Sequence, residues 1–144
     1  MSKELMQQNI QKAQLEIDAK KDIVKNGKMR QHYHFMAQTG WINDPNGLIY
    51  YKGKYHLFYQ YYDSPNWGPM HWAHATSTDL IHWEEQSIQF YPDEYGTMYS
   101  GCAVIANHET APAIFNEGEE GLVFFITSNG GNGGDIQKIT AAYS

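Results

Sequence analysis

The run Trp41-Ile42-Asn43-Asp44-Pro45-Asn46-Gly47 places one carboxylate beside a tryptophan and a turn-forming sequence. Pro45 biases Asp44 toward extended backbone, and the residues that follow predict a tight turn in which Gly47 takes a positive φ. We therefore expect the Asp44 carboxylate where a strand ends and a turn begins. Flat aromatic rings stack on the carbons of sugar rings, so this combination suits carboxylate chemistry on a sugar. The alternative is that residues 43–47 form a turn and nothing more.

Aromatic residues are concentrated in one part of the 144-residue chain, which is long enough for one modest core. Of the 21 Trp, Tyr and Phe residues, 17 lie between Tyr33 and Tyr99. A plain core would favour Leu, Ile and Val, whereas a block of Tyr and Trp indicates strands and a surface that recognises something flat.

The charge pattern argues against nucleic acid as a partner, since the net charge is −6. Residues 1–31 carry a net charge of +3 and residues 32–144 a net charge of −9, which suits a neutral substrate better than a polyanion. No signal peptide is recognisable, and no apolar run approaches the length of a membrane span. We therefore expect a soluble, cytoplasmic protein with no membrane partner. The sequence leaves the oligomeric state open.

Residues 2–26 show the apolar spacing of one amphipathic helix that ends at Asn26-Gly27. Its apolar stripe is narrow, so it either lies on the surface of a larger body or pairs with another copy. From Tyr33 onward the pattern predicts strands, with a hairpin turn at Lys52-Gly53. The expected strands are 47–51, 54–62, 70–76, 81–84, 99–106, 122–127 and 139–143. The 122–127 strand is wholly apolar and is expected to be buried on both faces, and 128–135 reads as a mobile loop.

Short strands with no helices between them indicate an all-β body. Propeller blades of known repeat families take about 40–50 residues each, so the region from His32 to Ser144 would hold about two blades. We therefore expect a helical extension at 1–31 and a partial propeller domain at 32–144.

Four segments in this order resemble glycoside hydrolase family 32, which includes invertases, sucrose-6-phosphate hydrolases, inulinases and levanases. They are Trp41–Gly47, Tyr55–Gln60, Trp67–His74 with Ser77, Asp79-Leu80 and His82-Trp83 after it, and Tyr99-Ser100-Gly101. The resemblance implies a five-bladed β-propeller, of which this chain is the N-terminal part, and hydrolysis of terminal β-D-fructofuranosides with retention. Retaining enzymes use two carboxyl groups about 5–5.5 Å apart.

The resemblance also implies a role for individual residues. Asp44 matches the nucleophile that forms a fructosyl-enzyme intermediate. Six residues match the substrate-binding positions, namely Trp41, Asn43, Gln60, Trp67, Tyr99 and Ser100. Tyr99 stands where most members have Phe.

Two motifs of the family do not occur in this chain. These are the Arg-Asp-Pro motif, whose Asp stabilises the transition state, and the Glu-Cys motif, which carries the acid/base. General acid catalysis typically contributes 10²–10⁴-fold, so we expect this chain, truncated at its C-terminus, to be inactive by itself.

The remaining reactive residues predict no cofactor and no metal. His71-x-x-His74 and His32-x-His34 lack a third ligand at a suitable spacing, so packed, hydrogen-bonded histidines are the favoured interpretation. Cys102 is the only cysteine, which excludes an intrachain disulfide, and its apolar surroundings predict a buried, inert thiol.

Three alternatives to the fructosidase hypothesis stay open at this point. The chain could belong to a related transfructosylase, in which case the products would be longer oligofructosides. It could be a catalytically inactive module that binds fructan or sucrose. It could also be a truncated product that does not fold alone, because the open end of a partial ring leaves strands unpaired.

Overall fold

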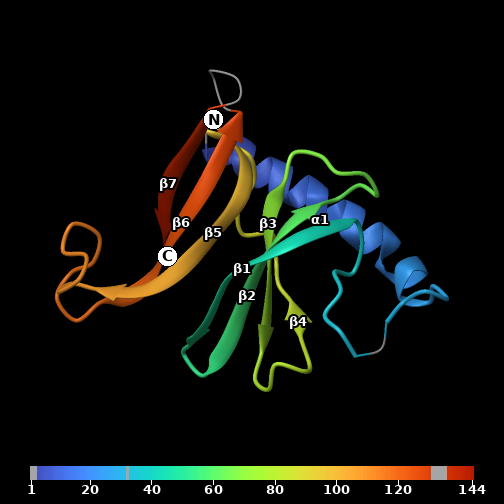
Figure 1. Ribbon diagram of the computed structural model, residues 1–144, viewed down its shortest axis with the longest axis horizontal. Helices are drawn as coiled ribbons and strands as arrows, with labels where there is room; N and C mark the ends of the chain where they lie inside the picture. Colours follow the sequence, from blue (N-terminus) through green and yellow to red (C-terminus); the bar gives the residue numbers. More distant parts are fainter. Residues whose placement is uncertain (1–2, 32, 131–135) are drawn as a thin grey trace.

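The computed structural model describes residues 3–31, 33–130 and 136–144, and it is built mainly of strands. One helix precedes seven strands along the chain (Figure 1). The elements are α1 (Lys3–Lys25), β1 (Trp41–Tyr51), β2 (Lys54–Tyr62), β3 (His71–Ser77), β4 (Glu84–Glu85), β5 (Gly96–Asn107), β6 (Glu120–Gly130) and β7 (Gln137–Tyr143). No described helix is long and apolar enough to cross a membrane.

The strands form two antiparallel sheets of the kind expected for propeller blades. The first has the order β1-β2-β3-β4 and the second has the order β5-β6-β7. The hairpin between β1 and β2 turns at Lys52 (φ 47°) and Gly53 (φ 82°), as the sequence predicts. Two central residues with positive φ match the twist of the flanking strands.

Helix α1 covers one face of the first sheet, behind the sheet in Figure 1. Ala13 and Ile17 are buried against alternate residues of β2, Tyr59 and Tyr61, and against Ala73 of β3. Side chains two positions apart on a strand point to the same face of the sheet. The narrow apolar stripe of α1 packs on that face. The sequence left two placements open for the helix, on the surface of a larger body or against another copy. In the structure the helix packs on the first sheet.

The other face of the first sheet packs on the second sheet. Phe58 and Trp72 from the first sheet meet Met98 and Phe124 from the second. The two sheets lie next to each other through β1 and β5 and do not close into a ring (Figure 1). The aromatic block of the sequence is divided among several places. Tyr51, Phe58, Trp72 and Phe90 lie in this core, whereas Tyr59 and Tyr61 lie in the cluster against α1, and residues such as Trp41 and Trp67 are exposed.

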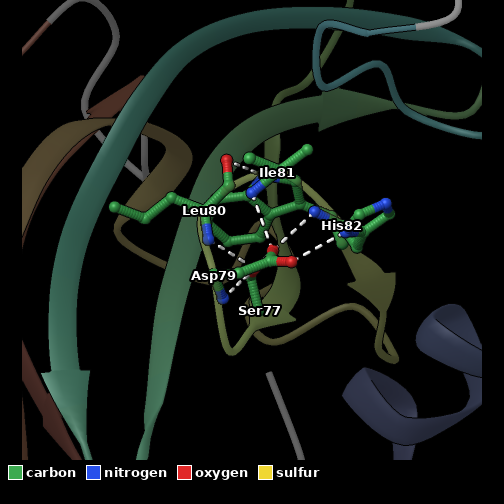
Figure 2. A network of polar contacts seen from close by, with 6 residues as sticks. Ser77, Asp79, Leu80, Ile81 and His82 are labelled. Carbon is green, nitrogen blue, oxygen red and sulfur yellow. Dashed lines mark hydrogen bonds and ion pairs between the residues drawn. The ribbon is translucent and has the colours of Figure 1, made fainter.

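The segment after β3 differs from the strand expected at 81–84. Figure 2 shows the Asp79 carboxylate at the centre of a network of hydrogen bonds. It accepts from the backbone N–H groups of Ile81 (2.9 Å) and His82 (2.8 Å). His82 Nδ1 is 2.7 Å from Asp79 Oδ2, and Ser77 Oγ is 3.1 Å from Oδ1. Because these N–H groups are bonded to a side chain, they are not available for pairing with β3. The chain pairs with β3 only from Glu84, where β4 begins.

Two burial predictions from the sequence are wrong. Phe125 is 42% exposed although its neighbours in β6 are buried, so this strand is not covered on both faces. Cys102 of β5 pairs with Phe125 and is also exposed, because it lies on the same uncovered side of the second sheet. The loop expected at 128–135 lies partly outside the described residues, and its first three residues belong to β6.

Candidate active site

Asp44 lies within the continuous strand β1, which is not the strand end that the sequence suggested. The pairing of β1 with β2 shifts register between Ile42 and Pro45, and again between Asn46 and Ile49. Each shift inserts one extra residue, which is the signature of a β-bulge. Bulges bend a strand and redirect its side chains, so the turn-forming residues act here without ending the strand. The predicted positive φ of Gly47 is confirmed at 50°.

Asn46 fixes the bulged segment to the neighbouring sheet. Its side chain is 3% exposed, donates from Nδ2 to the Asp44 carbonyl oxygen (3.1 Å) and accepts at Oδ1 from the Gly101 N–H (3.1 Å). A buried amide with both ends paired holds the two segments it joins. Asn46 therefore sets the position of Asp44 relative to β5.

The Asp44 carboxylate is exposed and meets Ser100 from the second sheet. Ser100 Oγ donates a hydrogen bond to Asp44 Oδ2 at 2.5 Å. The two residues are 56 positions apart in the chain, so the packing of β1 on β5 creates this contact. A hydroxyl donor to a carboxylate orients the oxygen and is among the stronger hydrogen bonds in proteins.

Trp41 and Asn43 lie beside Asp44 on β1. The Trp41 indole N–H donates a close hydrogen bond to the Asn43 side-chain oxygen. Both side chains are exposed, with Trp41 at 38%. An exposed indole face next to an amide can contact both the carbons and the hydroxyls of a sugar ring.

Gln60 and Trp72 hold the backbone at the start of β5 through hydrogen bonds. Gln60 is 6% exposed and donates from Nε2 to the Met98 carbonyl oxygen (3.3 Å). The fully buried Trp72 donates from Nε1 to the Tyr99 carbonyl oxygen (2.9 Å). No hydrogen bond joins Gln60 to Asp44 among the described residues. In this structure Gln60 therefore positions β5, and its expected contact with substrate stays a prediction.

Trp67 and Tyr99 lie together in a hollow of about 560 Å³. Trp67 belongs to the segment between β2 and β3 and is 54% exposed, while Tyr99 comes from β5. Asn129 Nδ2 of β6 donates to the Tyr99 hydroxyl at 3.3 Å. Tyr99 directly precedes Ser100 in β5.

The structure thus brings the predicted residues together in three groups. Asp44 pairs with Ser100, Trp41 pairs with Asn43, and Trp67 shares a hollow with Tyr99. Sequence reasoning missed Asn46, Trp72 and Asn129 as positioning residues. Only Asn46 gave a local signal, as part of the turn-forming run, and it was assigned to a turn.

The histidine motifs form no metal site in the part of the chain that the structure describes. No group of three or more His, Cys, Asp or Glu side chains is placed to hold an ion there. His74 Nε2 lies 3.1 Å from His56 Nδ1, as expected for a packed, hydrogen-bonded ring. His71 is fully buried, its ring nitrogens meet no side-chain hydrogen-bond partner among the described residues, and burial lowers its pKa to about 4. His71 is therefore neutral near pH 7, and its ring packs on Tyr62 and Tyr91. His32 lies outside the described residues.

Comparison with known proteins identifies the family. Residues 34–144 match the profile described as Glycosyl hydrolases family 32 N-terminal domain. The chain belongs to glycosyl hydrolase family 32. It is 54% identical over 123 residues to a fructan beta-fructosidase of Streptococcus mutans, covering 85% of this chain and 8% of that protein. It is 47% identical over 116 residues to a levanase of Bacillus subtilis, covering 80% of this chain and 16% of that protein.

Solved structures of family 32 proteins confirm the fold. A mutant of the Bombyx mori beta-fructofuranosidase, solved in complex with sucrose, superposes with a TM-score of 0.74 at 33% identity. The match covers 95% of this chain and 27% of that one. The prediction of a partial β-propeller with a preceding helix is therefore confirmed. The chain spans less than a third of the length of these relatives.

Proposed function

We propose that this chain supplies the nucleophile and the fructosyl-binding residues of a β-fructofuranosidase that works with retention. The observation that carries the proposal is the contact between Asp44 and Ser100, which fixes an exposed carboxylate beside Trp41 and Asn43. Membership of family 32 and the fructosidase and levanase relatives support the same chemistry.

The proposed reaction has two steps. An Asp44 oxygen attacks the anomeric carbon of the fructosyl unit, the bond from that carbon to the leaving oxygen breaks, and a carboxylic acid protonates the leaving oxygen. Water then attacks the same carbon, the bond to Asp44 breaks, and the acid recovers its proton from the water. Two inversions give net retention. No second carboxylate is hydrogen-bonded to Asp44 or Ser100 among the described residues.

In this proposal Ser100 holds the attacking oxygen of Asp44 toward the sugar. Asn43 hydrogen-bonds a fructose hydroxyl, Trp41 stacks on the ring, and Tyr99 and Trp67 border the site. Sucrose and fructans are both candidate substrates, and the sucrose complex of the Bombyx mori relative supports a small fructoside.

The test is turnover of sucrose by the full-length protein and its Asp44→Asn variant. We expect Asp44→Asn to abolish fructose release while sucrose still binds, and mass spectrometry of quenched wild-type protein to find a hexosyl group on the Asp44 peptide. The control is Asp22→Asn, a change of the same type at an exposed position of α1. Undiminished turnover by Asp44→Asn removes Asp44 from the role of nucleophile. Analysis of the products separates hydrolysis from fructosyl transfer.

Two expectations from the sequence stay predictions. One is the division into a helical extension at 1–31 and a glycosidase domain at 32–144. The other is the cytoplasmic location.

A further inference from the structure

A cavity of about 640 Å³ lies between the C-terminal end of α1 and the segment that leads to β1. Its volume is within the range of small-molecule sites. The described residues that line it are all polar or charged, and none of them belongs to the candidate active site. Such a lining suits a ligand that is charged or rich in hydroxyl groups.

Positive charge is concentrated at this cavity. Seven of the ten Lys and Arg residues lie in residues 1–31, although the protein as a whole has a net charge of −6. The cavity is lined by three of them, Lys21, Lys25 and Arg30, and by one carboxylate, that of Asp22. Three positive charges against one negative charge attract an anion to this place on an otherwise acidic protein.

Two of the three cations are available to a ligand. Lys21 Nζ forms an ion pair of 2.7 Å with Asp18 of the same helix. In the part of the chain that the structure describes, neither Lys25 nor Arg30 forms an ion pair with a carboxylate. The charges of Lys25 and Arg30 are therefore not neutralised by direct contact.

The Arg30 guanidinium is held in place by backbone carbonyl groups. Its Nη1 donates to the Ala37 carbonyl oxygen at 2.5 Å and its Nη2 to the Met36 carbonyl oxygen at 3.0 Å. A guanidinium has five N–H donors, so three remain for a ligand. The charge of Arg30 also acts on Glu85, but burial raises the pKa of Glu85 to about 7, so this carboxyl group is only partly ionised near neutral pH. A fixed planar fork of donors matches the oxygens of a phosphate group.

The carbonyl groups at the end of α1 are satisfied within the chain. The Asp22 carbonyl oxygen accepts from the Asn26 N–H at 3.3 Å and from Asn26 Nδ2 at 2.8 Å, and the Val24 carbonyl oxygen accepts from the Gly27 N–H at 3.0 Å. Unpaired carbonyl oxygens would present the negative end of the helix dipole to the cavity. These hydrogen bonds reduce that opposition to a bound anion.

Amide side chains of Gln31 and Gln38 also line the cavity. An amide both donates and accepts hydrogen bonds, which suits hydroxyl groups. We propose that this cavity binds a small phosphorylated compound that also carries hydroxyl groups. Lys25 and Arg30 hold its phosphate, and Gln31 and Gln38 hold its hydroxyl groups. The proposed site does not depend on the proposed function of Asp44.

Isothermal titration calorimetry of the full-length protein tests this with ribose 5-phosphate and with ribose as the neutral counterpart. We expect ribose 5-phosphate to bind at least about tenfold more tightly, because only its phosphate meets the two cations. This binding should weaken as the salt concentration rises. Absence of binding, or equal affinity for the two compounds, overturns the proposal.

The variant Lys25→Gln locates the binding site. It should weaken binding of ribose 5-phosphate about three- to tenfold, through loss of one charge-assisted hydrogen bond. The matched control is Lys12→Gln, an exposed position of α1 outside the cavity, which should leave the affinity unchanged. Asp44→Asn should also leave it unchanged. Unchanged affinity in Lys25→Gln overturns the proposal, and a loss in Asp44→Asn would assign the ligand to the candidate active site instead.

The variant Gln31→Ala tests the part of the cavity assigned to hydroxyl groups. It should weaken binding of ribose 5-phosphate about three- to fivefold and leave binding of inorganic phosphate unchanged, because inorganic phosphate has no sugar hydroxyl groups. Gln8→Ala, at an exposed position of α1, is the control. Equal effects on the two ligands overturn the role of the amide. Calorimetry reports binding whether or not the protein hydrolyses a fructoside, so failure of the proposed function leaves this test intact.

Discussion

Ser100 of β5 donates a hydrogen bond to the Asp44 carboxylate of β1, and this contact joins the two sheets at the candidate active site. The Asn46 side chain joins the same two strands, because it donates to the Asp44 carbonyl oxygen and accepts from the Gly101 N–H. One buried amide therefore determines how the exposed Ser100 and Asp44 face each other. The geometry of the carboxylate depends on the packing of two sheets and not on β1 alone.

Replacing Ser100 by Ala should lower kcat/KM for sucrose about ten- to a hundredfold, because a hydrogen bond to a charged group contributes about 1.5–3 kcal/mol. The loss should fall mainly on kcat, since the serine orients the attacking oxygen. Steady-state kinetics of the full-length protein measures it. Ser87→Ala, in the exposed segment after β4, is the matched control. Kinetics of Ser100→Ala equal to those of the control would contradict an orienting role.

Replacing Gly47 by Ala should destabilise the fold by about 1–3 kcal/mol, which urea unfolding can measure. The residue has φ +50°, and an added Cβ would lie 3.1 Å from Ala103 Cβ and 3.2 Å from Phe58 Cδ2. Gly53 is the matched control, because it has φ +82° but open space where its Cβ would lie. A larger loss in Gly53→Ala than in Gly47→Ala would show that contact with β5 is unimportant at this bulge.

Much of the fold could be predicted because it depends on local sequence patterns. The Lys52-Gly53 turn and the helix stop at Asn26-Gly27 follow from backbone preference. The runs of strand-forming residues likewise predict β2 and β3, which are buried along most of their length. The residues around Asp44 indicate it as a candidate, and Ser100 is indicated by the family resemblance, but the contact between them could not be read from the sequence. It depends on how β1 lies on β5.

The predictions that were wrong have a common physical origin. Each depends on which backbone group or side chain lies opposite a residue in the folded protein, and the sequence does not give this. The residues after Asp44 suit a turn, yet pairing with β2 continues through two bulges and keeps them in a strand. Asp79 captures N–H groups that a strand would have used. Cys102 and Phe125 look like core residues by type, but this side of the second sheet is uncovered.

Replacing Asp79 by Asn should destabilise the loop between β3 and β4 at neutral pH and have less effect in acid. Hydrogen bonds from the His82 side chain and from the His82 and Ile81 N–H groups hold the pKa of Asp79 well below its ordinary value. A depressed carboxyl pKa gives stability that is present above the unfolded value of about 3.9 and is lost as the pH falls below it.

Urea unfolding of wild type and Asp79→Asn at pH 7 and at pH 3 measures this difference. The gap between the two midpoints should narrow at pH 3. Asp22→Asn on α1, whose carboxylate is exposed, is the control for a general effect of removing a charge. A gap of the same size at both pH values would mean that the ionised carboxylate does not hold the loop.

Glu85 of β4 should make the fold less stable as the pH rises from about 4.5 to 7. Burial raises the pKa of Glu85 from its usual value of 4.5 to about 7, while hydrogen bonds from the Gln38 backbone and the Tyr59 hydroxyl and the charge of Arg30 act in the opposite direction. Within this window the folded protein retains a proton that the unfolded chain has released. Stability therefore falls as the pH rises, by up to about 3 kcal/mol.

Glu85→Gln should remove this slope, because an amide keeps the size of the side chain and does not ionise. Unfolding free energies of wild type and variant, measured from pH 4.5 to 8, should show the variant gaining relative stability up to pH 7 and no further gain above it. Glu84→Gln, the exposed neighbour on the same strand, should leave the wild-type slope intact. A wild-type slope that persists in Glu85→Gln would assign the titration to another group.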